Sequence, residues 1–172
     1  ETWLLNCDLS ILGNISTDFY YKGISSVNDC NDVLRGRPHG GLAILWRKTF
    51  SNCKVIDTLQ DSRLLGFEIT CGNRTLVFMN IYMPTSCVDN LNEFYFYLGK
   101  ISSFIEDSNT PYLYLVGDFN AHISALNVNT DHVFGRELLN YCNSENLFLS
   151  DIIFCDADSY TFCSSSHHTV SW

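Results

Sequence analysis

The 172-residue sequence predicts a layered α/β domain with mixed, mostly antiparallel sheets. Between residues 19 and 82, short apolar runs alternate with turn residues, which is typical of strands joined by hairpins. After residue 90, apolar residues recur every three or four positions, and strands then alternate with helices. With 46% hydrophobic residues, the chain can form a packed core, and its length suits one domain over 1–172.

The first half contains five predicted strands, at 19–24, 42–46, 55–59, 65–70 and 75–82. Residues 65–70 alternate between apolar and polar, the pattern of a strand with one buried face. The turn at 71–74 joins this strand to 75–82 in an antiparallel hairpin. Because 75–82 is apolar on both faces, we expect it to be a central strand.

The second half is predicted to alternate. An amphipathic helix covers 90–105, with Asn90 as its candidate cap. A buried strand follows at 112–117, and a polar loop then leads to a second helix at 135–146. Two short strands are expected at 148–153 and 160–163.

The charge distribution is uneven. The net charge is −9, and the whole deficit lies in residues 75–172, where eleven acids face only Lys100 and Arg136. Because phosphate contacts need basic side chains, this half argues against tight non-specific binding of nucleic acid. Phosphate chemistry there would depend on a metal ion. Arg35, Arg37, Arg47 and Lys48 are the candidate basic rim, although scattered surface bases are the more common explanation of such a set.

The eight cysteines form no Cys-x-x-Cys pair, so we expect buried free thiols rather than a zinc site or a redox motif. No apolar run approaches the length that a membrane span requires, and no signal peptide opens the sequence. The expected location is intracellular.

Residues 112–122 contain the main candidate site. Gly117 lets the backbone pass close to a neighbour, and Asp118 and Asn120 follow it. On an extended backbone these two side chains would point the same way. A carboxylate beside an amide suits a metal-bound water and a phosphate oxygen. The alternative interpretation is an ordinary turn, because Gly-Asp-x-Asn is also typical of turns.

Five segments, in order, carry a resemblance to a known family. They are 1–4, 40–45, 80–84, 117–122 and 160–172. They are similar to the endonuclease/exonuclease/phosphatase superfamily, in particular to the apurinic-type endonuclease domain of LINE-type (non-LTR) retrotransposons. The resemblance implies a DNase I-like, four-layered α/β sandwich in which two sheets face each other with helices outside.

The resemblance also implies residue roles. Glu1 is similar to the family's metal-binding glutamate, and Tyr82 to the tyrosine that reaches the scissile phosphate. Asp118 resembles the aspartate that orients or deprotonates the attacking water, and Asn120 its amide partner. Without the resemblance, Tyr82 would be read as a strand aromatic and Glu1 as an ordinary terminal carboxylate.

Three further residues match positions nearer the nucleic acid. Thr161 and Ser171 resemble residues that contact its backbone. A histidine at the position of His122 often follows this motif in retroelement relatives. We expect His122 to support the site through hydrogen bonds rather than to act as the base.

The expected reaction is hydrolysis of DNA phosphodiester bonds with Mg²⁺ or Mn²⁺. A divalent ion neutralises charge on the phosphate and acidifies bound water. Carboxylate oxygens are what Mg²⁺ prefers, and neutral donors such as Asn120 and Tyr82 can stabilise the transition state. The resemblance further implies DNA as substrate, a fused reverse transcriptase and action in the nucleus.

The family also has an early Asn, an Asp-His pair and a closing Ser-Asp-His that have no counterpart here, and Thr85 replaces its frequent Asn. We therefore expect a fragment that is incomplete at both ends and catalytically inactive or nearly so. Two alternatives remain: another phosphatase or phosphodiesterase of the superfamily, or a decayed retroelement remnant without activity.

Overall fold

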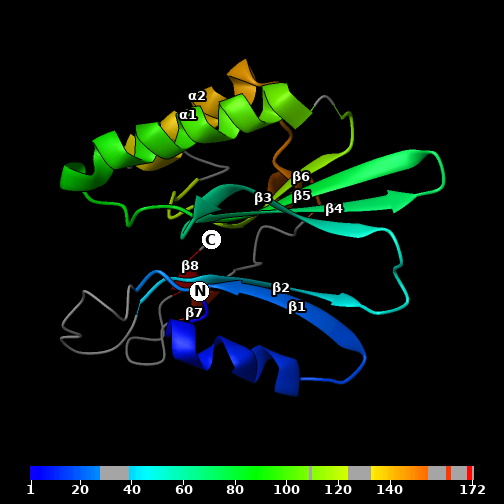
Figure 1. Cartoon of the computed structure of the whole chain (residues 1–172). Coiled ribbons are helices and arrows are strands. Elements are labelled where there is room, and N and C mark those ends of the chain that lie inside the picture. The colour runs from blue at the N-terminus through cyan, green and yellow to red at the C-terminus, as the bar shows by residue number, and fades with distance from the viewer. Residues whose placement is uncertain (28–38, 109, 124–132, 155–161, 164–169, 172) are drawn as a thin grey trace. The chain divides into compact units, whose positions relative to one another are not determined.

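The structure, a computed structural model, describes residues 1–27, 39–108, 110–123, 133–154, 162–163 and 170–171 (Figure 1). The chain divides into two compact units. The first unit contains residues 1–83 and 103–119, and the second contains 84–102 and 120–172.

The first unit contains two sheets, with a 3₁₀ helix at Asn6–Asn14. The smaller sheet is the antiparallel pair β1 (Phe19–Ile24) and β2 (Leu42–Arg47). The larger sheet has the order β3-β4-β5-β6, with bounds Cys53–Asp61, Leu64–Cys71, Arg74–Tyr82 and Leu113–Asp118. Only β5 and β6 pair in parallel, so the sheet is mixed and mostly antiparallel, as predicted.

The predicted hairpin and its central strand are confirmed. β4 and β5 pair antiparallel from Leu64–Ile81 to Cys71–Arg74, and β5 lies between β4 and β6. Its residues Val77, Met79 and Ile81 are buried. In β5, the apolar run on both faces coincides with a strand that has neighbours on both sides.

The two sheets of the first unit face each other (Figure 1). The ring of Trp46 on β2 lies 4.8 Å from that of Phe67 on β4. The side-chain amide of Asn80 on β5 donates a hydrogen bond of 3.1 Å to the carbonyl of Ala43 on β2. An apolar contact and a polar one thus join the facing sheets.

The strand at 112–117 was expected to be buried. The strand is present as β6, but the prediction of burial is wrong. β6 is the last strand of the described sheet, so it has a strand partner on one side only. Tyr114 and Val116 are each 46% exposed, and Asp118 is exposed at the end of the strand. An apolar run alone does not distinguish an edge strand from a central one.

Gly117 is the point at which β6 passes closest to β5, as expected. Its φ is +135°, and a Cβ placed there would overlap the Ile81 carbonyl oxygen and lie 2.8 Å from the Ile81 nitrogen. Only glycine permits both this backbone angle and this approach.

The second unit is mostly helical. Helix α1 (Leu91–Ser108) runs through both units, preceded by a 3₁₀ turn at Val88–Asn90, and Asn90 donates a hydrogen bond to the Thr85 carbonyl. Helix α2 is Val133–Ser144, two residues earlier than predicted. Phe94 of α1 meets Phe134 of α2 edge to face, with ring centroids 4.6 Å apart.

The strand predicted at 148–153 is wrong, because Ser150–Phe154 forms the short helix α3. Its opening Ser-Asp is typical of helix starts, a signal that the apolar residues around it obscured. Of the strand predicted at 160–163, the structure describes β7 (Phe162–Cys163), which pairs with β8 (Val170–Ser171). The remaining two positions lie outside the described residues.

The cysteines were expected to be buried thiols, and the structure corrects this. None of the five described cysteines is in a disulfide, but only Cys142 is buried, while Cys7, Cys71 and Cys87 are exposed. Three of the exposed or partly exposed ones lie at strand ends or in turns, where composition cannot predict burial. Among the described helices, none has the length and apolar character of a membrane span.

Candidate active site

Three side chains lie in a row across neighbouring strands of the larger sheet. Tyr82 ends β5 and Asp118 ends β6, and the two are direct partners in the parallel register. Arg63 lies just before β4, where its carbonyl accepts a hydrogen bond of 2.9 Å from the Tyr82 backbone N–H. The Met83 N–H donates to the Asp118 carbonyl at 2.9 Å. Because parallel strands end at the same edge, the sheet itself brings Tyr82 and Asp118 together.

Glu1 joins this row through Tyr82. The Tyr82 hydroxyl donates a hydrogen bond to the Glu1 carboxylate. Burial, this hydrogen bond and the Glu1 charge raise the pKa of Tyr82 to about 12. Tyr82 is therefore a neutral hydrogen-bond donor at neutral pH, not a phenolate.

The Glu1 carboxylate is held by several donors. Partial burial raises the pKa of this carboxylate. Hydrogen bonds lower it, and so does the charge of the α-amino group; together they outweigh burial, so the pKa is lowered overall. The hydrogen bonds come from the Tyr82 hydroxyl, the Trp3 indole and the Gly40 N–H. The group is ionised at neutral pH and largely exposed. It can therefore accept a cation from solvent.

A Gly-Gly pair places Glu1 beside Tyr82. The N–H groups of Thr2 and Trp3 donate to the carbonyls of Gly41 and Gly40 at 3.1 and 3.0 Å. A Cβ on Gly41 would lie 2.6 Å from the Thr2 hydroxyl and 3.0 Å from the Ile24 carbonyl oxygen. Without a side chain at this position, the N-terminal residues can lie against the start of β2.

Arg63 is the basic residue of this site, and sequence reasoning missed it. Its guanidinium lies 5.2 Å from the centre of the Tyr82 ring and donates to the Tyr82 carbonyl at 3.3 Å. Its backbone N–H donates to Asp61 at 2.9 Å. A signal was present, since Arg63 is the only base in the hairpin turn between the strands at 55–59 and 65–70.

The basic rim proposed from the sequence does not border this row. Arg47 and Lys48 lie at the far end of β2 from Gly41, a strand length of roughly 17 Å away at about 3.3 Å per residue. There they lie over the rings of Phe19 and Tyr20, at 5.8 and 5.3 Å. Arg35 and Arg37 lie outside the described residues.

From the sequence, Asp118 and Asn120 were expected on one extended backbone, but the extended backbone ends before Asn120. Strand β6 ends at Asp118, and Asn120 has a φ of +48°. Asn120 and His122 belong to the second unit. The His122 carbonyl lies so close to Gly135 of α2 that a Cβ there would overlap it.

The remaining predicted residues are described less fully. Ser171 lies in β8, which pairs with β7 through the register Phe162–Ser171. Thr161 lies outside the described residues. The structure thus brings together Glu1, Tyr82 and Asp118, and adds Arg63.

The donor set can be compared with the needs of a magnesium ion. Mg²⁺ is typically held by one or two carboxylates, with water and substrate oxygens completing its shell. Glu1 and Asp118 both neighbour Tyr82, which fits such a site. Within the described part of the chain, no group of three or more His, Cys, Asp or Glu side chains could hold a metal.

Two facing sheets, one antiparallel and one mixed, with the candidate residues at one strand edge have the architecture of the predicted DNase I-like fold. Among solved structures, the chain is similar to the endonuclease domain of TRAS1, a telomere-specific non-LTR retrotransposon. The match covers 96% of this chain and 75% of that one, with a TM-score of 0.65 and 13% sequence identity. No family model and no curated protein sequence matches the chain. The resemblance seen in the sequence is confirmed, and the predicted fold class with it.

Proposed function

We propose that this chain hydrolyses phosphodiester bonds in DNA with the help of a divalent metal ion. The observation that carries the proposal is the row Arg63–Tyr82–Asp118, with Glu1 hydrogen-bonded to Tyr82. It combines a cation, a neutral donor and two carboxylates at one sheet edge. The similarity of the fold to a retrotransposon endonuclease domain supports the same chemistry.

Glu1 and Asp118 would hold Mg²⁺ or Mn²⁺, and the lowered pKa of Glu1 keeps its carboxylate ionised at neutral pH. The bound ion would neutralise phosphate charge and acidify water. Two exposed carboxylates predict weak metal binding in the absence of substrate.

The protein side chains would do the remaining work. The Tyr82 hydroxyl, protonated at neutral pH, would donate a hydrogen bond to a non-bridging phosphate oxygen. The Arg63 guanidinium would neutralise a second oxygen. Asp118 would accept a proton from the attacking water, a contribution that is typically worth about 10²–10⁴-fold in rate.

The other residues predicted from the sequence would supply further contacts. We propose Asn120 as a phosphate donor, His122 as its support, and Thr161 and Ser171 as contacts to the DNA backbone. We retain the expectation that the 172-residue chain turns over slowly. In its full-length form, a fused reverse transcriptase and action in the nucleus are part of the proposal.

The test is nicking of supercoiled plasmid at high enzyme concentration, with Mg²⁺ or with EDTA, over many hours. We expect slow, metal-dependent conversion to open circles, abolished in Asp118→Ala and retained in Asp107→Ala, which removes an exposed carboxylate of α1. The melting temperature should rise with Mg²⁺ in the parent and Asp107→Ala proteins, but not in Asp118→Ala.

A substrate panel separates the alternatives. Abasic DNA, plain plasmid and a phosphoinositide are offered to the same preparation. Release of phosphate from the lipid, with DNA intact, would replace the nuclease proposal by the other superfamily activity. Absence of both nicking and Mg²⁺ stabilisation would favour the decayed remnant.

A further inference from the structure

The indole of Trp3 is held against the candidate metal ligand. Its N–H donates a hydrogen bond to the Glu1 carboxylate. The backbone N–H of Trp3 donates to the Gly40 carbonyl at 3.0 Å, and all three residues belong to the first unit. Trp3 therefore contacts Glu1 directly.

Packing does not explain the position of this side chain. Trp3 is 43% exposed, so much of its ring contributes nothing to the core. Its φ of +57° lies in the left-handed region, which a bulky residue rarely adopts. Strain of this kind persists where surrounding contacts require it, and it is common at functional sites. In this conformation the indole N–H meets the Glu1 carboxylate.

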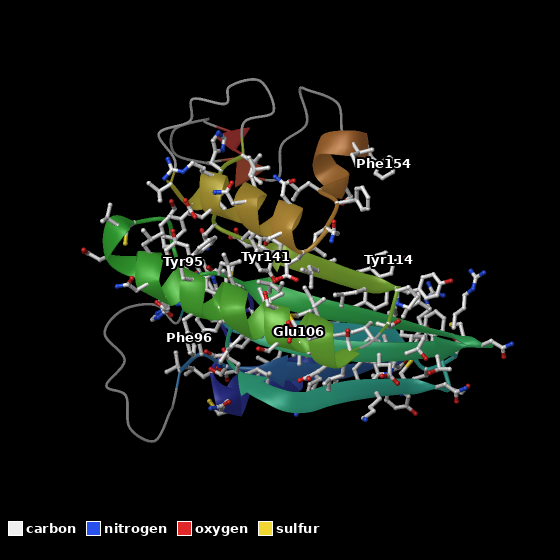
Figure 2. All side chains as sticks on the ribbon, turned by 90° about the horizontal axis from the view of Figure 1, so that it is seen from above. Tyr95, Phe96, Glu106, Tyr114, Tyr141 and Phe154 are labelled. Atoms are coloured by element: carbon white, nitrogen blue, oxygen red, sulfur yellow. The ribbon has the colours of Figure 1, made fainter. Side chains whose placement is uncertain are left out.

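Exposed aromatic rings are not unusual in this chain. Phe96 and Phe154, both labelled in Figure 2, are 57% and 83% exposed. Single exposed apolar side chains need no explanation. Trp3 differs from these two residues because it donates a hydrogen bond to a carboxylate of the candidate active site.

The donors around Glu1 leave little of its carboxylate unused. Within the described part of the chain, it accepts hydrogen bonds from the Trp3 indole, the Tyr82 hydroxyl and the Gly40 N–H. A carboxylate offers about four lone-pair positions, so about one remains for a cation. Mg²⁺ keeps several of its waters, so one oxygen from this carboxylate is enough.

The Tyr82 hydroxyl cannot donate to Glu1 and to a phosphate at the same time, because a tyrosine has one O–H hydrogen. In the structure this hydrogen is donated to Glu1. In the function proposed above, it is donated to a phosphate oxygen. When Tyr82 turns to the phosphate, the Trp3 indole is the side-chain donor that Glu1 retains among the described residues.

On the basis of that function, we infer that Trp3 is a positioning residue, which keeps the Glu1 carboxylate oriented for the metal ion while Tyr82 serves the phosphate. Groups that hydrogen-bond to a metal ligand fix its orientation, and their loss typically weakens metal binding about 10–100-fold. The indole N–H suits this role because it is a donor only and cannot itself bind the cation.

The test is a double-mutant cycle on Mn²⁺ binding, measured from the electron paramagnetic resonance signal of the free ion, so that no turnover is needed. One change replaces the Trp3 indole by benzothiophene, which keeps the ring shape and exchanges the N–H for sulfur. The whole chain with this ring is assembled by ligating residues 1–6 to a segment that begins at the exposed Cys7. The other change, Tyr82→Phe, removes the second donor. Tyr20→Phe, at a ring that is 52% exposed, is the matched control.

Where Tyr82 is present, we expect benzothiophene to raise the Mn²⁺ dissociation constant less than about threefold, because Tyr82 still holds Glu1. In the Tyr82→Phe chain the same replacement should raise it about tenfold or more, because both side-chain donors are then lost. Tyr20→Phe should leave the dissociation constant unchanged.

Two results would overturn the role of Trp3 and leave the proposed function standing. One is an equal factor in both backgrounds, which would mean that the indole supports the fold rather than the orientation of Glu1. The other is Mn²⁺ binding that Asp118→Ala abolishes but that benzothiophene changes in neither background. If the parent chain bound no Mn²⁺, the metal site itself would be wrong, and the role of Trp3 with it. Should the ligated chain fail to fold, Trp3→Phe, which also lacks the donor, replaces it in both backgrounds.

Discussion

Gly117→Ala tests how the sheet aligns the candidate site. Gly117 lies on β6 next to Asp118, with a φ of +135°, and the new Cβ would overlap the Ile81 carbonyl oxygen. The Ile81 nitrogen and carbonyl carbon would be 2.8 and 2.9 Å away. These atoms are backbone of the central strand and cannot rotate aside, so either β6 or β5 must shift.

Two costs add at this position. A side chain held in this backbone region costs about 1–3 kcal/mol. Forcing a methyl group against packed neighbours costs a further ~1–3 kcal/mol. We expect a total loss of about 2–6 kcal/mol, a large part of the roughly 5–15 kcal/mol that stabilises a domain. The register between Tyr82 and Asp118 should also be disturbed, so metal-dependent nicking should fall.

Two other glycines serve as controls in urea denaturation. Gly72 has a φ of +60° but no atom within 4 Å of a new Cβ, so Gly72→Ala should cost only the backbone strain, about 1–2 kcal/mol. Gly99→Ala, in a helix and in open space, should stabilise by about 0.5–1 kcal/mol. If Gly117→Ala lost no more stability than Gly72→Ala, the inferred contact between β5 and β6 would be wrong.

Three further outcomes follow from the packing and the electrostatics. Tyr82→Phe should lower the nicking rate about 10²–10³-fold, as loss of one transition-state donor does, without changing the circular dichroism spectrum. Between pH 10 and about 12, the free energy of unfolding should fall as pH rises. Tyr141 ionises near pH 10 in the unfolded chain, whereas burial raises its pKa in the folded chain to about 12. Urea titrations of the parent and Tyr141→Phe proteins over this pH range measure the effect. Phe94→Ala should cost about 3–5 kcal/mol in the same assay, because it removes a fully buried ring from its contact with Phe134.

Each of these three predictions would be contradicted by a specific result. A Tyr82→Phe protein that nicks at the parent rate would remove the hydroxyl from the mechanism. A Tyr141→Phe protein that loses stability as steeply as the parent above pH 10 would show that other groups cause the loss. A Phe94→Ala protein within 1 kcal/mol of the parent would mean that this ring is not part of the core.

Local patterns predicted most of the strands and both long helices. The alternation at 65–70 and the apolar run at 75–82 appear as β4 and β5, because burial of one or both faces imposes its period on the chain. Where the pattern was ambiguous, the prediction failed. The apolar segment around Ser150 forms a helix, and the apolar run of β6 is an edge strand.

The chemistry of Asp118 could be expected from residue type, and a role for Tyr82 only from the family resemblance. Their adjacency is a consequence of the parallel register of β5 and β6. The position of Arg63 as the base of a hairpin turn was a signal, but its contact with Tyr82 depends on strand pairing across about twenty residues of sequence. The positive φ of Asn120 agrees with the alternative of a turn at Gly-Asp-x-Asn, because Asn adopts this backbone region more readily than most residues.

The sequence by itself determined the class of fold, the order of its elements and the residue types available for phosphate chemistry, because these depend on local periodicity and composition. Only the tertiary structure decided which side chains meet. Glu1 reaches Tyr82 because Gly40 and Gly41 accept the N-terminal residues, and Arg63 reaches Tyr82 because β4 and β5 pair antiparallel. Contacts between distant segments depend on register and backbone approach, which no single segment encodes.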